Sequence, residues 1–327
     1  MKVYTIATPG TRIVCRRGGI YAVKKSGERV LIPPDTDIIV IASSRVGLSS
    51  KVVRLAARRG IDIVFLDYDG SPVARIYTPT INKTVFARVQ QYKLFQLDYG
   101  RRLAKEFVYS KIVNQAEVLR YLAKNYRDPA IREYAYQVDG VASELKAVDP
   151  KLLDRESLMV YESRAARIYW QAVSYMLPQE LGFKGRDHSS KDPFNMALNY
   201  GYGILYNVCE KALVLAGLDP YLGVLHTPKS GKESLTFDFT EMFRAIAVDK
   251  PLILDAKRIR FEFSGDRLDY ETRKSVAAVV TENLRQRYMY GKINRREELG
   301  EIIKKEAWDL AQSIREGSEY RGFRVVL

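Results

Sequence analysis

The spacing of apolar residues changes once along this 327-residue chain, at the segment 78-TPT-80. Before this segment, short apolar runs separated by turn residues are typical of β-strands. After it, apolar residues recur three and four positions apart, as they do on one face of a helix. We therefore predict an α+β fold in which a small β-rich N-terminal domain, residues 1–78, precedes a larger all-α domain, residues 79–327.

The N-terminal part is predicted to form short strands and one helix. The strands are expected within 2–7, 12–33, 37–42 and 61–77. Their turns are expected at Gly18-Gly19, Ser26-Gly27 and Asp69-Gly70, because glycine accepts the backbone angles that tight turns need. The helix is expected over 49–60, with a serine available as its N-cap and Gly60 as its stop.

The second part is predicted to be helical. From Lys83 to Tyr126 the chain contains no proline and only one glycine, which predicts a long helix. Further helices are expected over 131–147, 155–177, 193–216, 270–290 and 297–316. A short strand pair is expected near 252–263.

The composition indicates a polyanionic partner. Basic residues exceed acidic residues by 14 over the whole chain, and residues 1–78 alone carry a net charge of +7. Such an excess, with 22 tyrosines interleaved, suits nucleic acid. The two cysteines form no CxxC pair, and no run approaches the ~18 apolar residues of a membrane span. We therefore expect a cytoplasmic protein without a disulfide framework or membrane association.

Glu162 lies within a stripe of apolar residues that repeats at helical spacing. The stripe comprises Leu158, Ala165, Tyr169, Ala172 and Met176. A carboxylate on such a face is costly unless it is paired or binds a metal. A salt bridge to Arg164, Arg167 or a more distant arginine would satisfy it, so this position alone leaves a structural and a catalytic interpretation open.

His226, one of only two histidines, precedes two carboxylates that are set among apolar residues. Asp238 and Glu241 are three positions apart, so a helix over 234–244 would present both on one face. A lone histidine is usually packed or hydrogen-bonded, and Asp-x-x-Glu is often a solvated helical face. Together with Glu162, however, this combination of one imidazole and several acids predicts a metal site.

The ligand chemistry favours a hard divalent ion. Carboxylates with one imidazole suit Mg²⁺ or Mn²⁺, whereas zinc is less suited because no HExxH helix is present. Such an ion beside strong positive charge indicates phosphodiester chemistry. The chain has no P-loop, which argues against ATP-driven work. We interpret His188, in the polar and basic loop 184–193, as loop structure or a phosphate contact.

The chain also resembles the CRISPR-associated adaptation integrases, the enzymes that insert new spacers into CRISPR arrays. The resemblance extends over nearly the whole length and depends on the order and spacing of five segments. These are 60-GIDIVFLDYDGSPVAR-75, 162-ESRAARIYW-170, 192-DPFNMALNYGYGILY-206, 217-GLDPYLGVLH-226 and 234-SLTFDFTEMFRAIAVD-249.

The resemblance implies a set of site residues. In that family a helix glutamate, a histidine and a downstream acid bind the metal, which implies Glu162, His226 and an acid from 238-DFTE-241 here. Both Asp238 and Glu241 belong to the family pattern. We favour Glu241 as the metal ligand and place Asp238 beside it in the charge network of the catalytic site.

The resemblance further implies a metal-dependent DNA integrase and endonuclease. A DNA 3′-hydroxyl would attack a phosphodiester at the CRISPR repeat, with hydrolysis or resolution of branched DNA as side or reverse reactions. The expected partners are double-stranded and branched DNA, a second copy of the chain, and a small ferredoxin-like CRISPR adaptation protein. Dimerisation and DNA binding are expected of residues 1–78, and catalysis of residues 79–327.

Eight basic residues near these motifs are candidate phosphate contacts that would bind DNA without reading its sequence. They are Arg164, Arg167, Lys184, Arg186, Lys191, Lys229, Lys232 and Arg244. For each of them alone, a solvated surface charge is an equally good interpretation. Two other functions stay open, namely a general DNA nuclease and a non-catalytic DNA-binding scaffold of a defence complex, which would not need Glu162.

Overall fold

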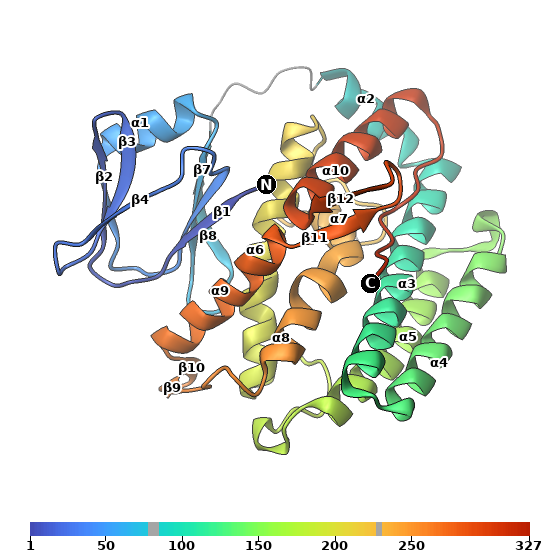
Figure 1. Ribbon diagram of the computed structural model, residues 1–327. Helices are drawn as coiled ribbons and strands as arrows, with labels where there is room; N and C mark the ends of the chain where they lie inside the picture. The colour runs from blue at the N-terminus through green and yellow to red at the C-terminus, as the bar shows by residue number, and fades with distance from the viewer. Residues whose placement is uncertain (78–84, 227–230) are drawn as a thin grey trace.

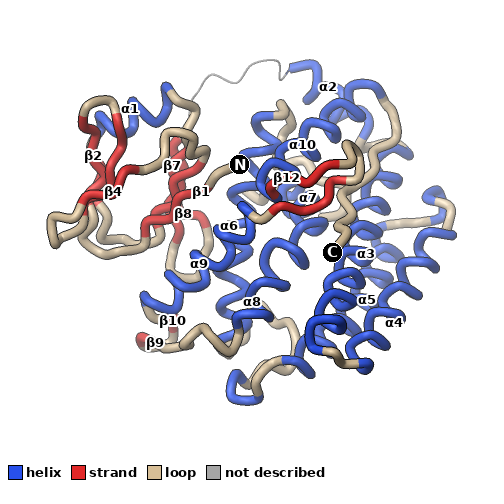
Figure 2. Tube along the Cα trace, viewed as in Figure 1, coloured by secondary structure: helices blue, strands red, loops and turns tan. Residues whose placement is uncertain are grey.

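The computed structural model describes residues 1–77, 85–226 and 231–327, and shows a β-rich part beside a larger helical part (Figure 1). Figure 2 shows most strands gathered on one side of the molecule and the helices on the other. This arrangement confirms the predicted α+β class. The predicted domain boundary at residues 78 and 79 falls outside the described residues.

The N-terminal part contains two four-stranded sheets. Its elements are β1 (Val3–Ile6), β2 (Arg12–Arg16), β3 (Gly19–Val23), β4 (Arg29–Leu31), β5 (Ile38–Ile41), β6 (Gly47–Leu48), α1 (Ser50–Arg58), β7 (Asp62–Leu66) and β8 (Pro72–Ile76). One sheet has the order β1-β5-β7-β8, and the other has the order β4-β3-β2-β6. The predicted strand ranges are confirmed, and Gly18, Gly27 and Gly70 each have the positive φ that their turns require.

The sheet of β1, β5 and β7 is buried on both faces, and this accounts for the unbroken apolar run of β5. Ile39 and Ile41 pack towards the second sheet and α1, in a small core of their own. Ile38 and Val40 point the other way, into the large core formed by the helices. The three strands run parallel, and parallel strands covered on both sides typically show no polar alternation. The sheet is therefore the layer that the two parts of the protein share.

The second part is built mainly from helices. They are α2 (Val85–Leu94), α3 (Asp98–Tyr126), α4 (Pro129–Ala147), α5 (Arg155–Met176), α6 (Pro193–Leu215), α7 (Ser234–Arg244), α8 (Lys250–Asp255), α9 (Tyr270–Arg285) and α10 (Leu299–Glu316). A π-helical turn, Ala245–Asp249, joins α7 to α8. Two short hairpins are also present, β9 (Phe263–Ser264) with β10 (Arg267–Leu268), and β11 (Arg287–Tyr290) with β12 (Arg295–Glu298). No helix among the described residues has both the length and the apolar character needed to cross a bilayer.

Three sequence predictions for this part are corrected by the structure. The long helix expected up to Tyr126 is divided into α2 and α3, because Leu97 has an extended backbone. The strand pair expected near 252–263 is wrong, since Lys250–Asp255 is helical and the hairpin starts only at Phe263. The helix expected over 270–290 ends at Arg285, and Arg287–Tyr290 form β11 after the C-cap Gln286.

Physical causes for two of these differences are visible in the side chains. Pro251 comes two residues after the π-helical turn and donates no backbone hydrogen bond, but the side chain of Asn283 donates to the carbonyls of Ile246 and Ala247 in the preceding turn. Leu252 and Ile253 are buried. In β11, Tyr288 and Tyr290 are buried and alternate with more exposed neighbours, which is the period of a strand. The second part is therefore mainly helical, with two hairpins, rather than wholly helical.

Acidic N-caps begin two of the helices that carry family motifs, α5 and α6. The Asp154 side chain accepts a hydrogen bond of 2.8 Å from the backbone N–H of Ser157 at the start of α5. Asp192 does the same for Asn195 at the start of α6, where a proline occupies the first turn. In α1, by contrast, Ser49 stands at the predicted N-cap, but its side chain makes no capping hydrogen bond.

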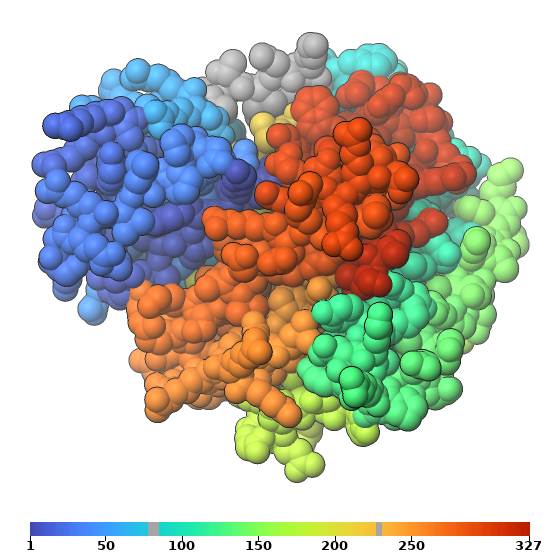
Figure 3. Space-filling view, viewed as in Figure 1, coloured from blue at the N-terminus to red at the C-terminus, as the bar shows by residue number. Residues whose placement is uncertain are grey.

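The β-rich part is fixed onto α6 by close backbone packing. Gly70, in the turn between β7 and β8, lies so close to Gly203 that a Cβ at residue 203 would overlap the carbonyl oxygen of Gly70. Lys211, two turns further along α6, donates hydrogen bonds of 2.7 Å to the carbonyls of Asp37 and Gly60. Figure 3 shows the N-terminal residues as a lobe against the C-terminal segments.

This packing predicts that Gly203→Ala is destabilising. The added methyl group must push the β7–β8 turn away from α6, and overpacking of this kind costs about 1–3 kcal/mol. Chemical denaturation would measure the loss of unfolding free energy. Gly140→Ala is the control, because no other atom lies within 4 Å of a Cβ at that helical position, and alanine there should add up to about 1 kcal/mol. Equal stabilities of the two variants would contradict the proposed close contact.

Candidate active site

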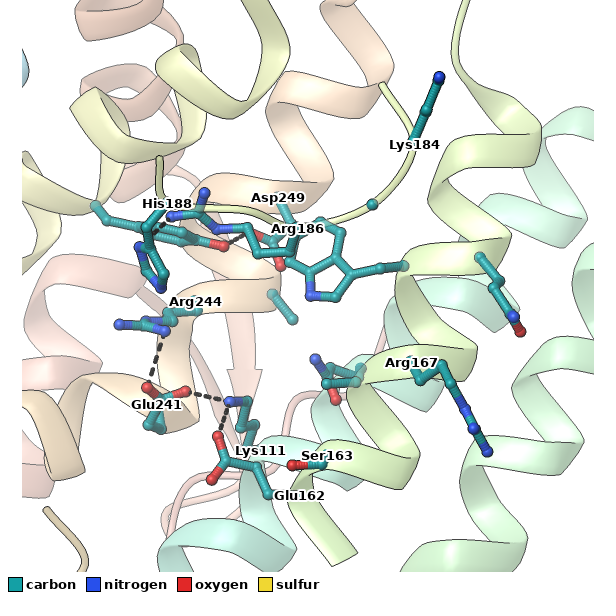
Figure 4. A pocket seen from close by; sticks show the side chains of 17 residues that line it. Lys111, Glu162, Ser163, Arg167, Lys184, Arg186, His188, Glu241, Arg244 and Asp249 are labelled. Carbon is teal, nitrogen blue, oxygen red and sulfur yellow. Dashed lines mark hydrogen bonds and ion pairs between the residues drawn. The ribbon is translucent and has the colours of Figure 1, made fainter. Parts of the chain in front are cut away.

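Two glutamates from different helices contact one ammonium group. Lys111 of α3 places its Nζ 2.5 Å from Oε1 of Glu162 on α5 and 2.6 Å from Oε2 of Glu241 on α7. Figure 4 shows the lysine between the two carboxylates. The structure therefore brings together two of the acids that the sequence analysis selected, although 79 positions separate them in the chain.

Glu241 remains charged in spite of its burial. Only 2% of its side chain is exposed, and Arg244 lies 2.9 Å from its Oε1. Burial raises the pKa of this carboxyl group, but Arg244, Lys111 and His226 outweigh that effect and lower the pKa to about 2. Burial likewise lowers the pKa of Lys111, whereas Glu162 and Glu241 raise it by more, above its usual value. The centre of the site is therefore a compact ionic cluster.

Asp238 organises the loop that carries His226. Its fully buried carboxylate accepts hydrogen bonds from the backbone N–H groups of Val224, Leu225 and His226 at 2.6, 2.9 and 2.9 Å. It also lies 2.6 Å from Nδ1 of the His226 ring. Both of its oxygens are thus engaged within the loop, and the contact to Nδ1 leaves Nε2 as the ring nitrogen available to a ligand.

The His226 loop is also tied to the helix that carries Glu162. Arg155, in the first turn of α5, donates a hydrogen bond of 2.6 Å to the carbonyl of Leu225. This bond fixes the end of the loop against α5, the helix that carries Glu162. The His226 loop and Glu162 are therefore positioned by the same helix.

The fit of a metal ion can be judged from these donors. Among residues 1–77, 85–226 and 231–327, no three histidine, cysteine or acidic side chains gather closely enough to bind one ion, and the cation between Glu162 and Glu241 is the ammonium group of Lys111. The donor types nevertheless suit a hard divalent ion. The carboxylates of Glu162 and Glu241 lie close enough to share the ammonium group of Lys111, and Asp238 fixes the orientation of the His226 ring. Oε2 of Glu162 is buried and has no hydrogen-bond partner, so it offers an unused ligand atom.

A pocket of about 540 Å³ opens over this cluster. Its charged or titratable lining residues are Lys111, Glu162, Arg167, Lys184, Arg186, His188, Glu241, Arg244 and Asp249. Figure 4 shows Glu162, Glu241 and Lys111 at one end of the pocket, with Arg186, His188 and Asp249 at the other. The pocket thus combines a carboxylate pair with several cations, which suits a phosphodiester substrate.

Asp249, on the π-helical turn, contributes a second buried carboxyl group. It accepts hydrogen bonds from the hydroxyls of Tyr169 at 3.1 Å and Tyr202 at 2.6 Å. Burial raises its pKa to about 6. The guanidinium groups of Arg186 and Arg244 pack on the ring of Tyr202, 5.4 and 4.7 Å from its centroid. The tyrosine anchored by Asp249 therefore supports both arginines at the pocket.

The basic candidates differ in where the structure places them. Arg167, Lys184, Arg186 and Arg244 line the pocket. Arg164 instead pairs with Glu144 at 2.7 Å on the outer face of α5, and exposed Lys191 pairs with Asp266 at 3.0 Å. Lys232 lies over the ring of Phe237, and Lys229 falls outside the described residues. The ion pair considered for Glu162 is present, but its partner is Lys111 rather than a neighbouring arginine.

Sequence analysis missed Lys111 and Asp249. Lys111 follows Phe107 and Val108 and precedes Ile112, all of which are buried in α3, and Asp249 ends a buried apolar run. A charged residue among apolar helical positions is the same signal that singled out Glu162, so it was available for both. His188 was interpreted as loop structure or a phosphate contact, and it lies at the pocket opposite the carboxylate pair.

Comparison with known proteins gives the family of the chain. A family model described as CRISPR associated protein Cas1 matches residues 4–294. The chain belongs to the Cas1 family. A relative, the CRISPR-associated endonuclease Cas1 of Hyperthermus butylicus, is 39% identical over 99% of this chain and 98% of its own length. The family resemblance inferred from five sequence segments is thereby confirmed.

Solved structures share the fold of this Cas1 family member. A casposase bound to integration product has a TM-score of 0.85 and 22% identity, with 98% of this chain and 93% of that chain covered. A chain of a Cas6-RT-Cas1–Cas2 complex has a TM-score of 0.77 and 18% identity, with 99% of this chain and 36% of that chain covered. At these identities the likeness concerns the fold, and it agrees with the α+β arrangement.

The hydrogen bonds of Asp238 predict a stability effect for Asp238→Asn. An amide keeps the size of the side chain but can present only one oxygen to the three N–H groups and the imidazole, so at least one buried donor loses its partner. Such a loss costs about 1–3 kcal/mol, and chemical denaturation would measure it. Asp187→Asn is the control, because Asp187 makes similar bonds in an exposed loop. If Asp238→Asn lost no more unfolding free energy than Asp187→Asn, Asp238 would not be holding the His226 loop in place.

The raised pKa of Asp249 predicts a pH-dependent stability. The folded protein retains this proton up to about pH 6, whereas an unfolded aspartate loses it near ~4. Stability therefore falls as the pH rises from about 4 to about 6, by up to about 3 kcal/mol. Asp249→Asn removes this group, so the stability of the variant relative to wild type should rise over that window and stay constant above it. Denaturation at several pH values would measure the difference, and a constant difference throughout would contradict the assignment.

Proposed function

We propose that this protein is a divalent-metal-dependent DNA integrase and endonuclease of CRISPR spacer acquisition. The observation that carries the proposal is the meeting of Glu162 and Glu241 in a cationic pocket, with the ring of His226 held by Asp238 on a loop that is hydrogen-bonded to the helix of Glu162. Membership of the Cas1 family, whose relatives are named endonucleases, supports cleavage of phosphodiester bonds. The similar fold of a casposase bound to integration product supports the joining of DNA strands.

Glu162, His226 and Glu241 would bind the ion, Mg²⁺ or Mn²⁺. When bound, such an ion supplies positive charge that stabilises the developing charge on a phosphodiester. Asp238 keeps the His226 ring in place through Nδ1 and is already occupied by three backbone N–H groups. This supports Glu241, rather than Asp238, as the acid that contacts the ion.

The cations of the pocket would bind and orient the DNA. Arg167, Lys184, Arg186 and Arg244 line it, and contacts from such residues to phosphates fix a strand without reading its sequence. In the joining reaction the 3′-oxygen of the incoming strand forms a bond to phosphorus, and the bond from that phosphorus to the 3′-oxygen of the target strand breaks. The attacking hydroxyl loses its proton and the leaving oxygen gains one, so no nucleotide hydrolysis is required.

The N-terminal residues 1–78 would serve dimerisation and DNA binding, and residues 79–327 would carry the catalytic site. The net charge of +7 over residues 1–78 supports contact with the DNA backbone. The similar fold within a Cas6-RT-Cas1–Cas2 complex supports a second CRISPR protein as partner. We propose that this partner is small and ferredoxin-like, and that two copies of the present chain dock on it.

A strand-transfer assay tests the proposed function. A labelled short duplex with a free 3′-hydroxyl and a branched DNA resembling half-integrated product are incubated with Mn²⁺, Mg²⁺ or EDTA. Metal-dependent joining or resolution is expected for wild type, and Glu162→Gln and His226→Ala should each reduce it by about 100-fold or more while leaving DNA binding intact. Glu144→Gln is the matched control, because this exposed glutamate pairs only at the surface.

Other outcomes would point to other functions. Full activity of both site variants would mean that the metal site is misassigned. DNA binding without any metal-dependent product would indicate a scaffold. Cleavage that proceeds equally when the 3′-hydroxyl is replaced by hydrogen would indicate a general nuclease, because joining requires that hydroxyl as the attacking group.

A further inference from the structure

We propose that Lys111 is the resident counter-ion of the carboxylate pair, that it competes with the divalent ion for these carboxylates, and that Gln115 accepts its ammonium group when the ion enters. The inference rests on the proposed function, since it concerns the same site. It makes Lys111 and Gln115 positioning residues that set the metal affinity.

The position of Lys111 excludes simultaneous binding of an ion at the same oxygens. Its Nζ contacts Oε1 of Glu162 and Oε2 of Glu241 at 2.5 and 2.6 Å, so the two carboxylate oxygens lie within about 5 Å of each other. Glu241 is buried and Glu162 is only partly exposed, and two carboxylates at this separation repel each other unless a cation lies between them. A bound Mg²⁺ or Mn²⁺ must approach carboxylate oxygens to about 2.1 Å, and the ammonium group must then leave.

Gln115 offers the ammonium group a second position. It follows Lys111 by four residues on α3, so both side chains lie on the same face of the helix, and both line the pocket. Its Oε1 is buried and has no hydrogen-bond partner, which is uncommon for a buried polar atom. A lysine that leaves the carboxylates therefore finds a free acceptor one turn away.

Two of the buried atoms without hydrogen-bond partners at this site could gain partners in one exchange. With Lys111 between the glutamates, Oε2 of Glu162 and Oε1 of Gln115 both lack hydrogen-bond partners. With an ion between the glutamates, the ion can take up the free oxygen of Glu162, and the displaced lysine can take up that of Gln115. The metal affinity then depends on the difference in free energy between the lysine-bound and the ion-bound arrangement. Removing Lys111 should therefore strengthen metal binding, and removing the acceptor of Gln115 should weaken it.

The test is a titration of the full-length protein, without DNA, in which electron paramagnetic resonance measures free Mn²⁺. Lys111→Met removes the competing charge and should lower the dissociation constant about tenfold, whereas Gln115→Leu removes the acceptor for the displaced lysine and should raise it about threefold. Lys211→Met is the matched control, a buried lysine that pairs with Asp62 far along α6, and should leave the constant within about twofold. Glu162→Gln tests the metal site itself.

Thermal unfolding provides the second measurement. Without metal, Lys111→Met should melt below wild type because its two carboxylates have lost their shared cation, and Mn²⁺ should stabilise it more than wild type. If Lys111→Met does not fold without metal, Gln115→Leu alone decides the matter. A Lys111→Met affinity equal to or weaker than that of wild type overturns the counter-ion role, and an unchanged Gln115→Leu affinity overturns the role of Gln115.

The failure of the proposed function would look different. If wild type binds no Mn²⁺, or if Glu162→Gln binds it as tightly as wild type does, the metal site itself is wrong and the inference is overturned with it. If Glu162→Gln abolishes binding while Lys111→Met binds no more tightly than wild type, the metal site stands and only the inference about Lys111 is overturned.

Discussion

The site depends on the compensation of buried charge. Glu241 is almost completely buried, and it is tolerated there because Lys111 and Arg244 provide positive charge within hydrogen-bond distance. Isolated charges in such surroundings would be prohibitively costly, so α3, α5 and α7 must pack in a single arrangement that brings these groups together.

Several functional side chains of the site are also oriented by a second residue. Asp238 holds the loop and ring of His226, and Tyr202, bonded to Asp249, supports Arg186 and Arg244. Such support reduces the reorganisation that a reaction would otherwise require. The π-helical turn that carries Asp249 matches the frequent occurrence of π-bulges at functional sites.

Much of the fold could be predicted because it depends on local patterns. The strand ranges of the N-terminal part, the glycine turns and most helices follow from apolar periodicity and turn chemistry. The same reasoning assigned residues 252–263 to strands, since a short apolar run such as Leu252 and Ile253 suits a buried helix equally well. Apolar periodicity also could not show that the chain changes from helix α9 to strand β11, because that strand is stabilised by pairing with β12.

The sequence by itself determined the α+β division, the membership of a family and the acids that lie on apolar faces. Glu162, His226 and Glu241 could be selected because charge at an apolar position is visible in a linear chain. Only the tertiary structure decided that Lys111 is the partner of both glutamates, that Asp238 is occupied by the His226 loop, and that Arg164 and Lys191 point away from the pocket. The physical reason is that these pairings join residues 12 to 130 positions apart, and spacing along the chain carries no information on such contacts until the helices pack.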